Sequence, residues 1–115
     1  MRSLLAVGVL QLALGCANAA EDRQSGNFFF KFCKAGMEQR GRDYISGNCH
    51  GTIAGIAAIS ELLPAEFRSC PPANAPRSQA VRVVVKYLED HPGELNKDLE
   101  QLIVTALREA WPCKK

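Results

Sequence analysis

The set of cysteines constrains the fold of this 115-residue chain more than any other feature. One of the five cysteines, Cys16, lies in an apolar N-terminal run, and the other four are Cys33, Cys49, Cys70 and Cys113. An even number of cysteines in a small exported chain predicts two disulfide bonds. A zinc site would need close pairs such as Cys-x-x-Cys, which the sequence lacks. We therefore predict two disulfides, no metal site and no cofactor.

The geometry of helical hairpins selects one of the three possible pairings. In an antiparallel pair of helices, residues equidistant from the connecting turn lie side by side. Cys33 and Cys49 are equally far from a predicted turn at Gly41, and Cys70 and Cys113 are almost equally far from a second turn. The spacing predicts the bonds Cys33–Cys49 and Cys70–Cys113.

The first 19 residues have the features of a signal peptide. Arg2 provides a positive start, and Leu4–Leu14 is an apolar run too short to span a bilayer. Ala17–Ala19 has the small-residue pattern of a cleavage site, which predicts a mature chain that begins at Ala20. Lipidation of Cys16 is a weaker alternative, because the residues before it match a lipoprotein signal poorly. We predict a periplasmic location.

Residues 20–115 are predicted to form a single domain. Removal of residues 1–19 takes away one positive charge, so that the formal net charge falls from +2 to +1. This balance argues against a protein that binds nucleic acid through a basic field. No second apolar run approaches the roughly 20 residues that a membrane-spanning helix needs.

Helical periodicity predicts an all-α fold, a small disulfide-bonded bundle of four to five helices. Residues 20–26 are predicted to be a frayed terminus, and Asn27 is predicted to cap a first helix that carries the aromatic cluster Phe28–Phe32. This cluster can pack into the core alone or also form a dimer or partner surface. Gly36 and Gly41 are predicted to lie in a polar connection.

The second helix is expected from about Asp43 to Leu63, where Pro64 ends it. Glycines recur on it every fourth residue, at positions 47, 51 and 55, and this stripe predicts close approach of a neighbouring helix. A short helical turn is expected over 65–68, followed by a proline-rich link over 70–76.

The stretch from Val81 to Pro92 has the composition of a strand but the spacing of a helix. Strand alternation fails at Val84, whereas a helical stripe runs through Val81, Val84, Val85 and Leu88. We expect a helix from about residue 76 to 90, because burial of four aliphatic side chains outweighs the low helix propensity of valine. A fourth helix is expected after a cap at residue 96, with the apolar stripe Leu99, Leu102, Ile103, Ala106, Leu107 and Ala110.

The C-terminal half resembles the Tai/Rap family of periplasmic immunity proteins, which neutralise peptidoglycan amidase effectors of type VI secretion. The similarity covers most of residues 33–113 and has all four cysteines in register. It rests on Cys70-Pro71-Pro72, Gln79, Val83-Val84-Val85-Lys86-Tyr87-Leu88, His91-Pro92, Leu95, Leu102-Ile103, Ala106-Leu107 and Trp111-Pro112-Cys113, together with Cys33 and Cys49 through Ile56 upstream.

The resemblance implies a helical bundle, often a homodimer, without catalysis of its own. By the same resemblance the protein would bind one partner, a papain-like cysteine amidase, and occlude its active cleft. The polar segment around Pro64 is the candidate partner-binding site, with Glu61, Glu66, Phe67 and Arg68 as its residues.

Two histidines invite catalytic or metal-binding hypotheses that the spacing disfavours. His50 follows Cys49 directly, and adjacent helical residues point about 100° apart, so the two cannot act as base and nucleophile. His91 precedes Pro92 at a predicted helix end, where a cationic side chain suits the helix dipole. We interpret both as structural residues.

Two other functions remain open from the sequence. An HdeA-like periplasmic acid-stress chaperone is also small, helical and disulfide-bonded, but it would have to open in acid, which two disulfides oppose. An exported interaction protein with an unknown partner is the second alternative. A hydrolase is disfavoured, because the sequence has no Gly-x-Ser-x-Gly turn and no unpaired cysteine beyond the signal segment.

Overall fold

The computed structural model describes residues 24–38 and 44–114, and within these ranges every regular element is helical. The four α-helices are α1 (Gly26–Glu38), α2 (Tyr44–Ile59), α3 (Arg77–Asp90) and α4 (Leu99–Ala110). Two short 3-10 helices, η1 (Ser60–Leu62) and η2 (Pro92–Glu94), follow α2 and α3. The predicted all-α fold is confirmed.

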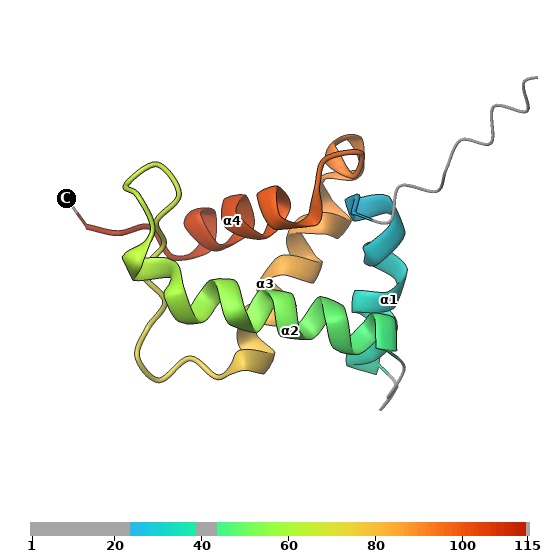
Figure 1. Cartoon of the computed structure of the whole chain (residues 1–115), viewed down its shortest axis with the longest axis horizontal. Helices are drawn as coiled ribbons and strands as arrows, with labels where there is room; N and C mark the ends of the chain where they lie inside the picture. Colours follow the sequence, from blue (N-terminus) through green and yellow to red (C-terminus); the bar gives the residue numbers. More distant parts are fainter. Residues whose placement is uncertain (1–23, 39–43, 115) are drawn as a thin grey trace, which may run out of the picture.

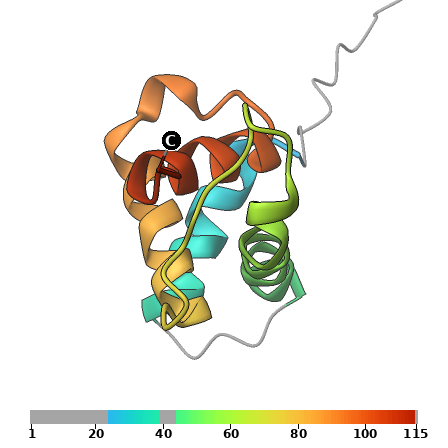
Figure 2. The same cartoon turned by 90° about the vertical axis from the view of Figure 1, so that its left-hand side faces the viewer.

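The helices enclose one core, to which α3 and α4 contribute most of the buried residues. α3 packs against the other three helices. In Figure 1, α2 and α4 extend in the same direction across the molecule and α1 crosses their right-hand end. Figure 2 looks along α2 and shows α2 and α3 on opposite sides, with α4 above them.

The stretch that begins at Val81 is a helix, as its spacing predicts. Val81, Val84, Val85 and Leu88 are all buried in α3. The backbone conformation of Pro76 is extended, and the helix starts at the next residue. In α4 the predicted stripe is buried from Leu99 to Leu107, whereas Ala110 is exposed.

The two predicted disulfides are present, with the predicted pairing. Cys33 and Cys49 join α1 to α2, and both are fully buried. Cys70 and Cys113 join the segment before α3 to the segment after α4, and the backbone N–H of Cys70 donates to the carbonyl of Trp111 at 2.8 Å. Under the loop-entropy model the two bonds stabilise the fold by about 3 and about 4 kcal/mol.

The beginning of the described chain is hydrogen-bonded to the start of α4, so the prediction of a frayed terminus is wrong for residues 24–26. The N–H of Leu99 donates to the carbonyl of Gln24 at 2.7 Å. Gly26 and Asn27 donate to the carbonyls of Lys97 and Leu95, at 2.9 and 2.7 Å. Gly26 is buried, and a Cβ there would overlap the side chain of Leu102.

The predicted N-terminal caps of α1 and α4, Asn27 and Asn96, are not the caps that the structure shows. α1 begins at Gly26, and the hydroxyl of Ser25 accepts a hydrogen bond from the N–H of Phe28 at 3.4 Å, which is the cap geometry expected of a serine. Asn27 therefore lies inside the helix. α4 begins after Asp98, two residues later than the predicted cap at Asn96, because the intervening residues bond to the N-terminal segment.

The glycine stripe of α2 does not pack against a helix. A Cβ at position 47, 51 or 55 would meet nothing within 4 Å, and all three glycines are exposed. Close approach occurs instead at Gly36, which lies in α1 and not in a polar connection. A Cβ at Gly36 would overlap the hydroxyl of Ser46 and lie 3.0 Å from Nε2 of His50. The prediction that a neighbouring helix approaches closely at the glycines of α2 is therefore wrong, and the close approach is at Gly36 of α1.

The end of α2 also differs from its prediction. The α-helix stops at Ile59 and continues as the 3-10 helix η1, and residues 65–67 form a hydrogen-bonded turn without a helix. The signal segment, Cys16 and the predicted turn at Gly41 lie outside the described residues. No helix in the described ranges is long and apolar enough to cross a membrane.

Candidate functional site

The last residue of α2, the 3-10 helix η1 and the turn that follows form a largely exposed segment, residues 59–68, called the projecting segment below. Figure 1 shows it looping out at the end of α2, on the side of the molecule where the C-terminus lies. Three of its large apolar side chains are exposed: Ile59 at 48%, Leu62 at 83% and Phe67 at 51%. Side chains of this size normally lie in a core, and their concentration on one loop is typical of a contact surface.

The projecting segment is fixed at both ends. Ser60 is buried, and its hydroxyl donates to the carbonyl of Ala57 at 2.8 Å. At the other end Ser69 is buried, and Cys70 carries both the disulfide and the hydrogen bond to Trp111. The segment therefore starts and ends on the core.

Hydrogen bonds inside the projecting segment also define its shape. The N–H of Phe67 donates to the carbonyl of Pro64 at 2.8 Å, which closes a turn. Nε of Arg68 donates to the carbonyl of Leu63 at 2.9 Å. Because proline fixes one backbone dihedral, these bonds act on a segment that is already restricted. A pre-ordered loop loses less conformational entropy when it binds.

All four residues predicted as partner-binding lie on this segment and are exposed: Glu61, Glu66, Phe67 and Arg68. The sequence reasoning missed Ile59 and Leu62. Both lie off the stripe that the sequence predicts through Ile56, Ser60 and Leu63, and this offset is the signal that could have identified them.

A hollow of 490 Å³ adjoins the projecting segment. Its walls come from the end of α2, the proline-rich link and the start of α3, and Trp111 contributes from the C-terminal segment. Glu61 and Leu62 line it on one side and Arg77 lines it on the other. A partner that covers the projecting segment would therefore also meet this hollow.

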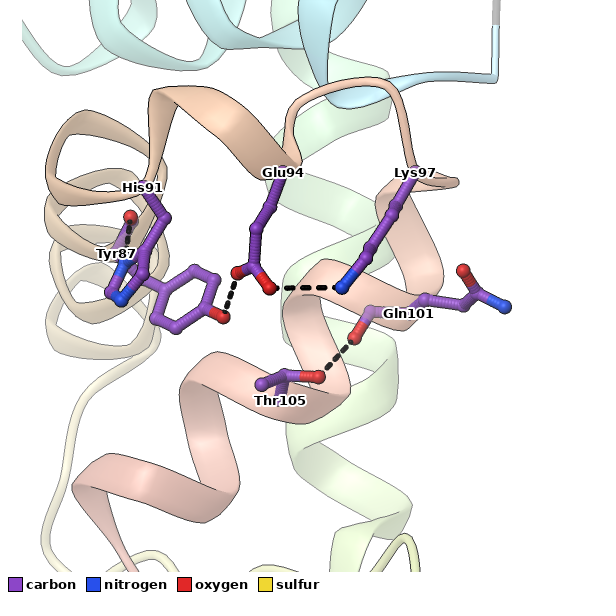
Figure 3. A network of polar contacts seen from close by, with 6 residues as sticks. All are labelled: Tyr87, His91, Glu94, Lys97, Gln101 and Thr105. Carbon is purple, nitrogen blue, oxygen red and sulfur yellow. Dashed lines mark hydrogen bonds and ion pairs between the residues drawn. The ribbon is translucent and has the colours of Figure 1, made fainter.

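A second polar arrangement holds the connection between α3 and α4 (Figure 3). The hydroxyl of Tyr87 donates to Oε2 of Glu94, and Nζ of Lys97 lies 2.8 Å from Oε1 of the same carboxylate. His91 Nδ1 donates to the carbonyl of Tyr87 at 2.8 Å, and the two rings stack with centroids 3.9 Å apart. His91 thus satisfies a carbonyl at the end of α3, which agrees with its predicted structural role.

We call the contacts of Tyr87 and Lys97 with Glu94 the clasp, and the pKa shifts of its residues favour these contacts. Hydrogen bonds from Lys97 and from Tyr87 lower the pKa of Glu94 below its ordinary value. Burial, with the neighbouring Glu94 carboxylate, raises the pKa of Tyr87. A tyrosine that keeps its proton and a glutamate that stays ionised are matched as donor and acceptor.

None of the four described cysteines is available as a thiol nucleophile. The four cysteines are paired in disulfides. The half-buried ring of His50 has its Nε2 3.4 Å from the carbonyl oxygen of Cys33, and because a carbonyl can only accept, Nε2 is the donor. No three potential metal ligands of residues 24–38 and 44–114 form a group that could hold an ion.

The aromatic cluster of α1 lies between core and surface. Phe29 and Phe30 are partly buried and pack against the core. Phe28 is half-buried, and its ring centroid lies 5.2 Å from that of Phe29 and 5.5 Å from that of Phe32. Lys31 places its ammonium 4.9 Å from the centroid of the Phe32 ring. Both expected uses of the cluster are compatible with this position.

The fold and this surface define a small, disulfide-bonded helical protein whose exposed apolar side chains gather mainly on one anchored loop. A family model described as Rap1a immunity proteins matches residues 25–113, and the chain belongs to this family. The resemblance to Tai/Rap immunity proteins is thereby confirmed at the level of the family. Membership implies a protein partner, the effector that an immunity protein counteracts. Searches of curated proteins and of solved structures found no significant match.

Proposed function

We propose that this protein is an exported immunity protein that binds a peptidoglycan amidase effector of type VI secretion and occludes its active cleft. The family supports the immunity role, and two disulfides are consistent with an oxidising compartment such as the periplasm. The action is stoichiometric binding, without a catalytic step of its own.

The observation that carries the proposal is the projecting segment. It combines exposed apolar side chains at Leu62 and Phe67 with charges at Glu61, Glu66 and Arg68. Binding energy at protein interfaces is concentrated in a few large side chains that become desolvated, and the surrounding charges set orientation and specificity. A segment of this kind is suited to enter a cleft, where Leu62 and Phe67 would be the anchors.

The decisive experiment tests the protein against a purified peptidoglycan amidase effector of type VI secretion. We expect the oxidised protein to form a complex with it and to abolish cleavage of peptidoglycan stem peptides at a one-to-one ratio. The double variant L62S/F67A should weaken binding by about 100-fold or more, because two central apolar contacts are lost. Its thermal unfolding should stay close to that of the wild type, since both side chains are exposed.

The matched control is Y44S. Tyr44 is 85% exposed and lies at the start of α2, at the opposite end of the helix from the projecting segment. We expect binding within twofold of the wild type. Equal loss of binding in Y44S and L62S/F67A would remove the projecting segment from the interface.

The chaperone alternative predicts a different result. Such a protein would show no affinity for the amidase and would suppress aggregation of unfolded proteins after acidification. The homodimer that the family resemblance implies also stays a prediction, and sedimentation velocity of the oxidised protein tests it.

A further inference from the structure

A second hollow, of 460 Å³, lies between α1, α2 and α3 on the part of α2 that precedes the projecting segment. Its lining includes Met37, His50, Ala54, Arg77, Val81 and Arg82, and we call it the cationic groove. The volume is within the range of about 300–1,000 Å³ that is typical of ligand sites. None of the described residues that line it is acidic.

The two arginines of the cationic groove form no ion pair with the described residues. Ion pairs in the described part of the chain join Lys34 to Glu89, Lys86 to Asp90 and Lys97 to Glu94, and none involves Arg77 or Arg82. Neither guanidinium donates a hydrogen bond to another of the described residues. Both side chains are exposed, and the described residues leave their donors free for a ligand.

The two arginines reach the groove from different sides of α3. They are five residues apart, so their side chains leave the helix about 140° from each other, and both line the hollow. Val81 is buried between them and contributes an apolar floor. A carboxylate held by a guanidinium group beside an apolar floor is partly removed from water, which strengthens the charge-assisted hydrogen bonds.

The cationic groove is continuous with the surface of the projecting segment. Ala54 and Arg77 line both the groove and the 490 Å³ hollow, and that hollow is lined in turn by Glu61 and Leu62. A protein that covers the projecting segment would therefore reach Arg77 without a gap.

We propose that the cationic groove binds an acidic segment of the same protein partner, one that places one carboxylate on Arg77, a second carboxylate on Arg82 and an aliphatic side chain on Val81. This inference rests on the proposed function for the identity of the partner. The binding chemistry itself belongs to the groove and can be tested on the protein alone.

The test is a titration of isotope-labelled, oxidised protein with a capped pentapeptide of sequence Ala-Glu-Leu-Asp-Ala, followed by amide chemical shifts. We expect the signals of Ala54, Val81 and Arg82 to move. The double variant R77Q/R82Q should weaken the interaction by about tenfold or more, because the charge-assisted hydrogen bonds are lost. The uncharged peptide Ala-Gln-Leu-Asn-Ala should bind at least tenfold more weakly than the acidic peptide.

The charge-matched control is R108Q/K114Q, which also removes two positive charges, at exposed positions outside the groove. It should bind the acidic peptide within twofold of the wild type. Equal weakening by both double variants, equal binding of both peptides, or no shift in the groove would overturn the proposal. So would inorganic phosphate that moves the same signals with the affinity of the peptide, since this would define a general anion site.

The peptide result separates this proposal from the function proposed above. If the acidic peptide binds the groove and no amidase is bound, the groove stands and the amidase partner is wrong. If the amidase is bound equally by the wild type and R77Q/R82Q and the peptide does not bind, the proposed function stands and the groove is excluded.

Discussion

The N-terminal helices and the C-terminal helices use their apolar residues in different ways. Of the fifteen buried hydrophobic residues in the described chain, only Cys33, Cys49 and Ile53 belong to α1 and α2. The large hydrophobic residues that are exposed show the opposite distribution, because all of them precede residue 70: Met37, Tyr44, Ile59, Leu62 and Phe67. The comparison assigns stability mainly to α3 and α4, and it places most of the exposed large hydrophobic residues on the projecting segment, the candidate contact surface.

The disulfides follow the same division. The bond between Cys33 and Cys49 is buried between the two helices that contribute least to the core. The bond between Cys70 and Cys113 encloses α3 and α4 and ends beside the projecting segment. One bond therefore compensates for a thin core, and the other fixes one end of the candidate contact segment.

Removal of each disulfide is the strongest way to separate these roles. We expect C70A/C113A to lower the free energy of unfolding by about 4 kcal/mol and C33A/C49A to lower it by about 3 kcal/mol, measured by urea unfolding. Only C70A/C113A should also weaken binding to the amidase, because it releases the end of the projecting segment. A binding defect of equal size in C33A/C49A would contradict the division.

A matched pair of leucine variants tests the division between core residues and contact-surface residues. Leu107 is 1% exposed in α4, and Leu62 is 83% exposed on the projecting segment. Leu107→Ala should lower the free energy of unfolding by about 3 kcal/mol, whereas Leu62→Ala should change it by less than about 0.5 kcal/mol. Thermal and urea unfolding measure both. A large loss in Leu62→Ala would show that the segment is part of the core.

The clasp between α3 and α4 has a smaller effect, with a defined dependence on pH. Tyr87→Phe should lower the free energy of unfolding by about 1 kcal/mol, because Glu94 loses a hydrogen-bond donor. The pKa of Glu94 is lowered in the folded protein, so its contribution is present above the ordinary value of 4.5 and is lost as the pH falls through the lowered pKa. The stability difference between wild type and E94Q should therefore shrink below pH 4.5, and a difference that grew in acid would refute this account.

The change expected at Gly51 is the smallest of these, and Gly36 provides the contrast. Gly51→Ala should raise the free energy of unfolding by about 0.5–1 kcal/mol, because a Cβ there meets no atom and alanine favours the helix. Gly36→Ala should lower it, because the added Cβ would displace Ser46 and His50. Opposite signs in urea unfolding are the check, and a loss in Gly51→Ala would indicate that this face of α2 is covered.

The sequence was sufficient for the parts of the fold that a periodic pattern encodes. The valines and leucines of α3 and α4 predicted both helices and their buried faces, and the cysteine spacing predicted both disulfides. The glycine stripe of α2 led to a wrong prediction of close helix packing, because glycine has no side chain whose polarity would indicate which face is buried. The exposed charges of the candidate site were also predictable, since Pro64 requires a break in the helix there.

Other features leave no pattern in a sequence. The bonds from Gly26 and Leu99 to distant carbonyls involve only backbone atoms, which every residue carries. The contact of Tyr87 with Glu94 depends on where η2 turns the chain. The cationic groove brings together His50 from α2 and Arg82 from α3, and their proximity follows only from the packing of the two helices.

The hydrogen bonds between residues 24–27 and the start of α4 make the folding of α4 depend on a distant part of the chain. Leu99 donates to Gln24, so the first turn of α4 is completed by a residue more than 70 positions earlier. Contacts of such long sequence separation form late and slow the folding of a small domain. We expect an isolated α3–α4 fragment to fray at Leu99 although it holds most of the core. The N-terminal segment of the described chain and the start of α4 would then acquire their structure together, in one cooperative step.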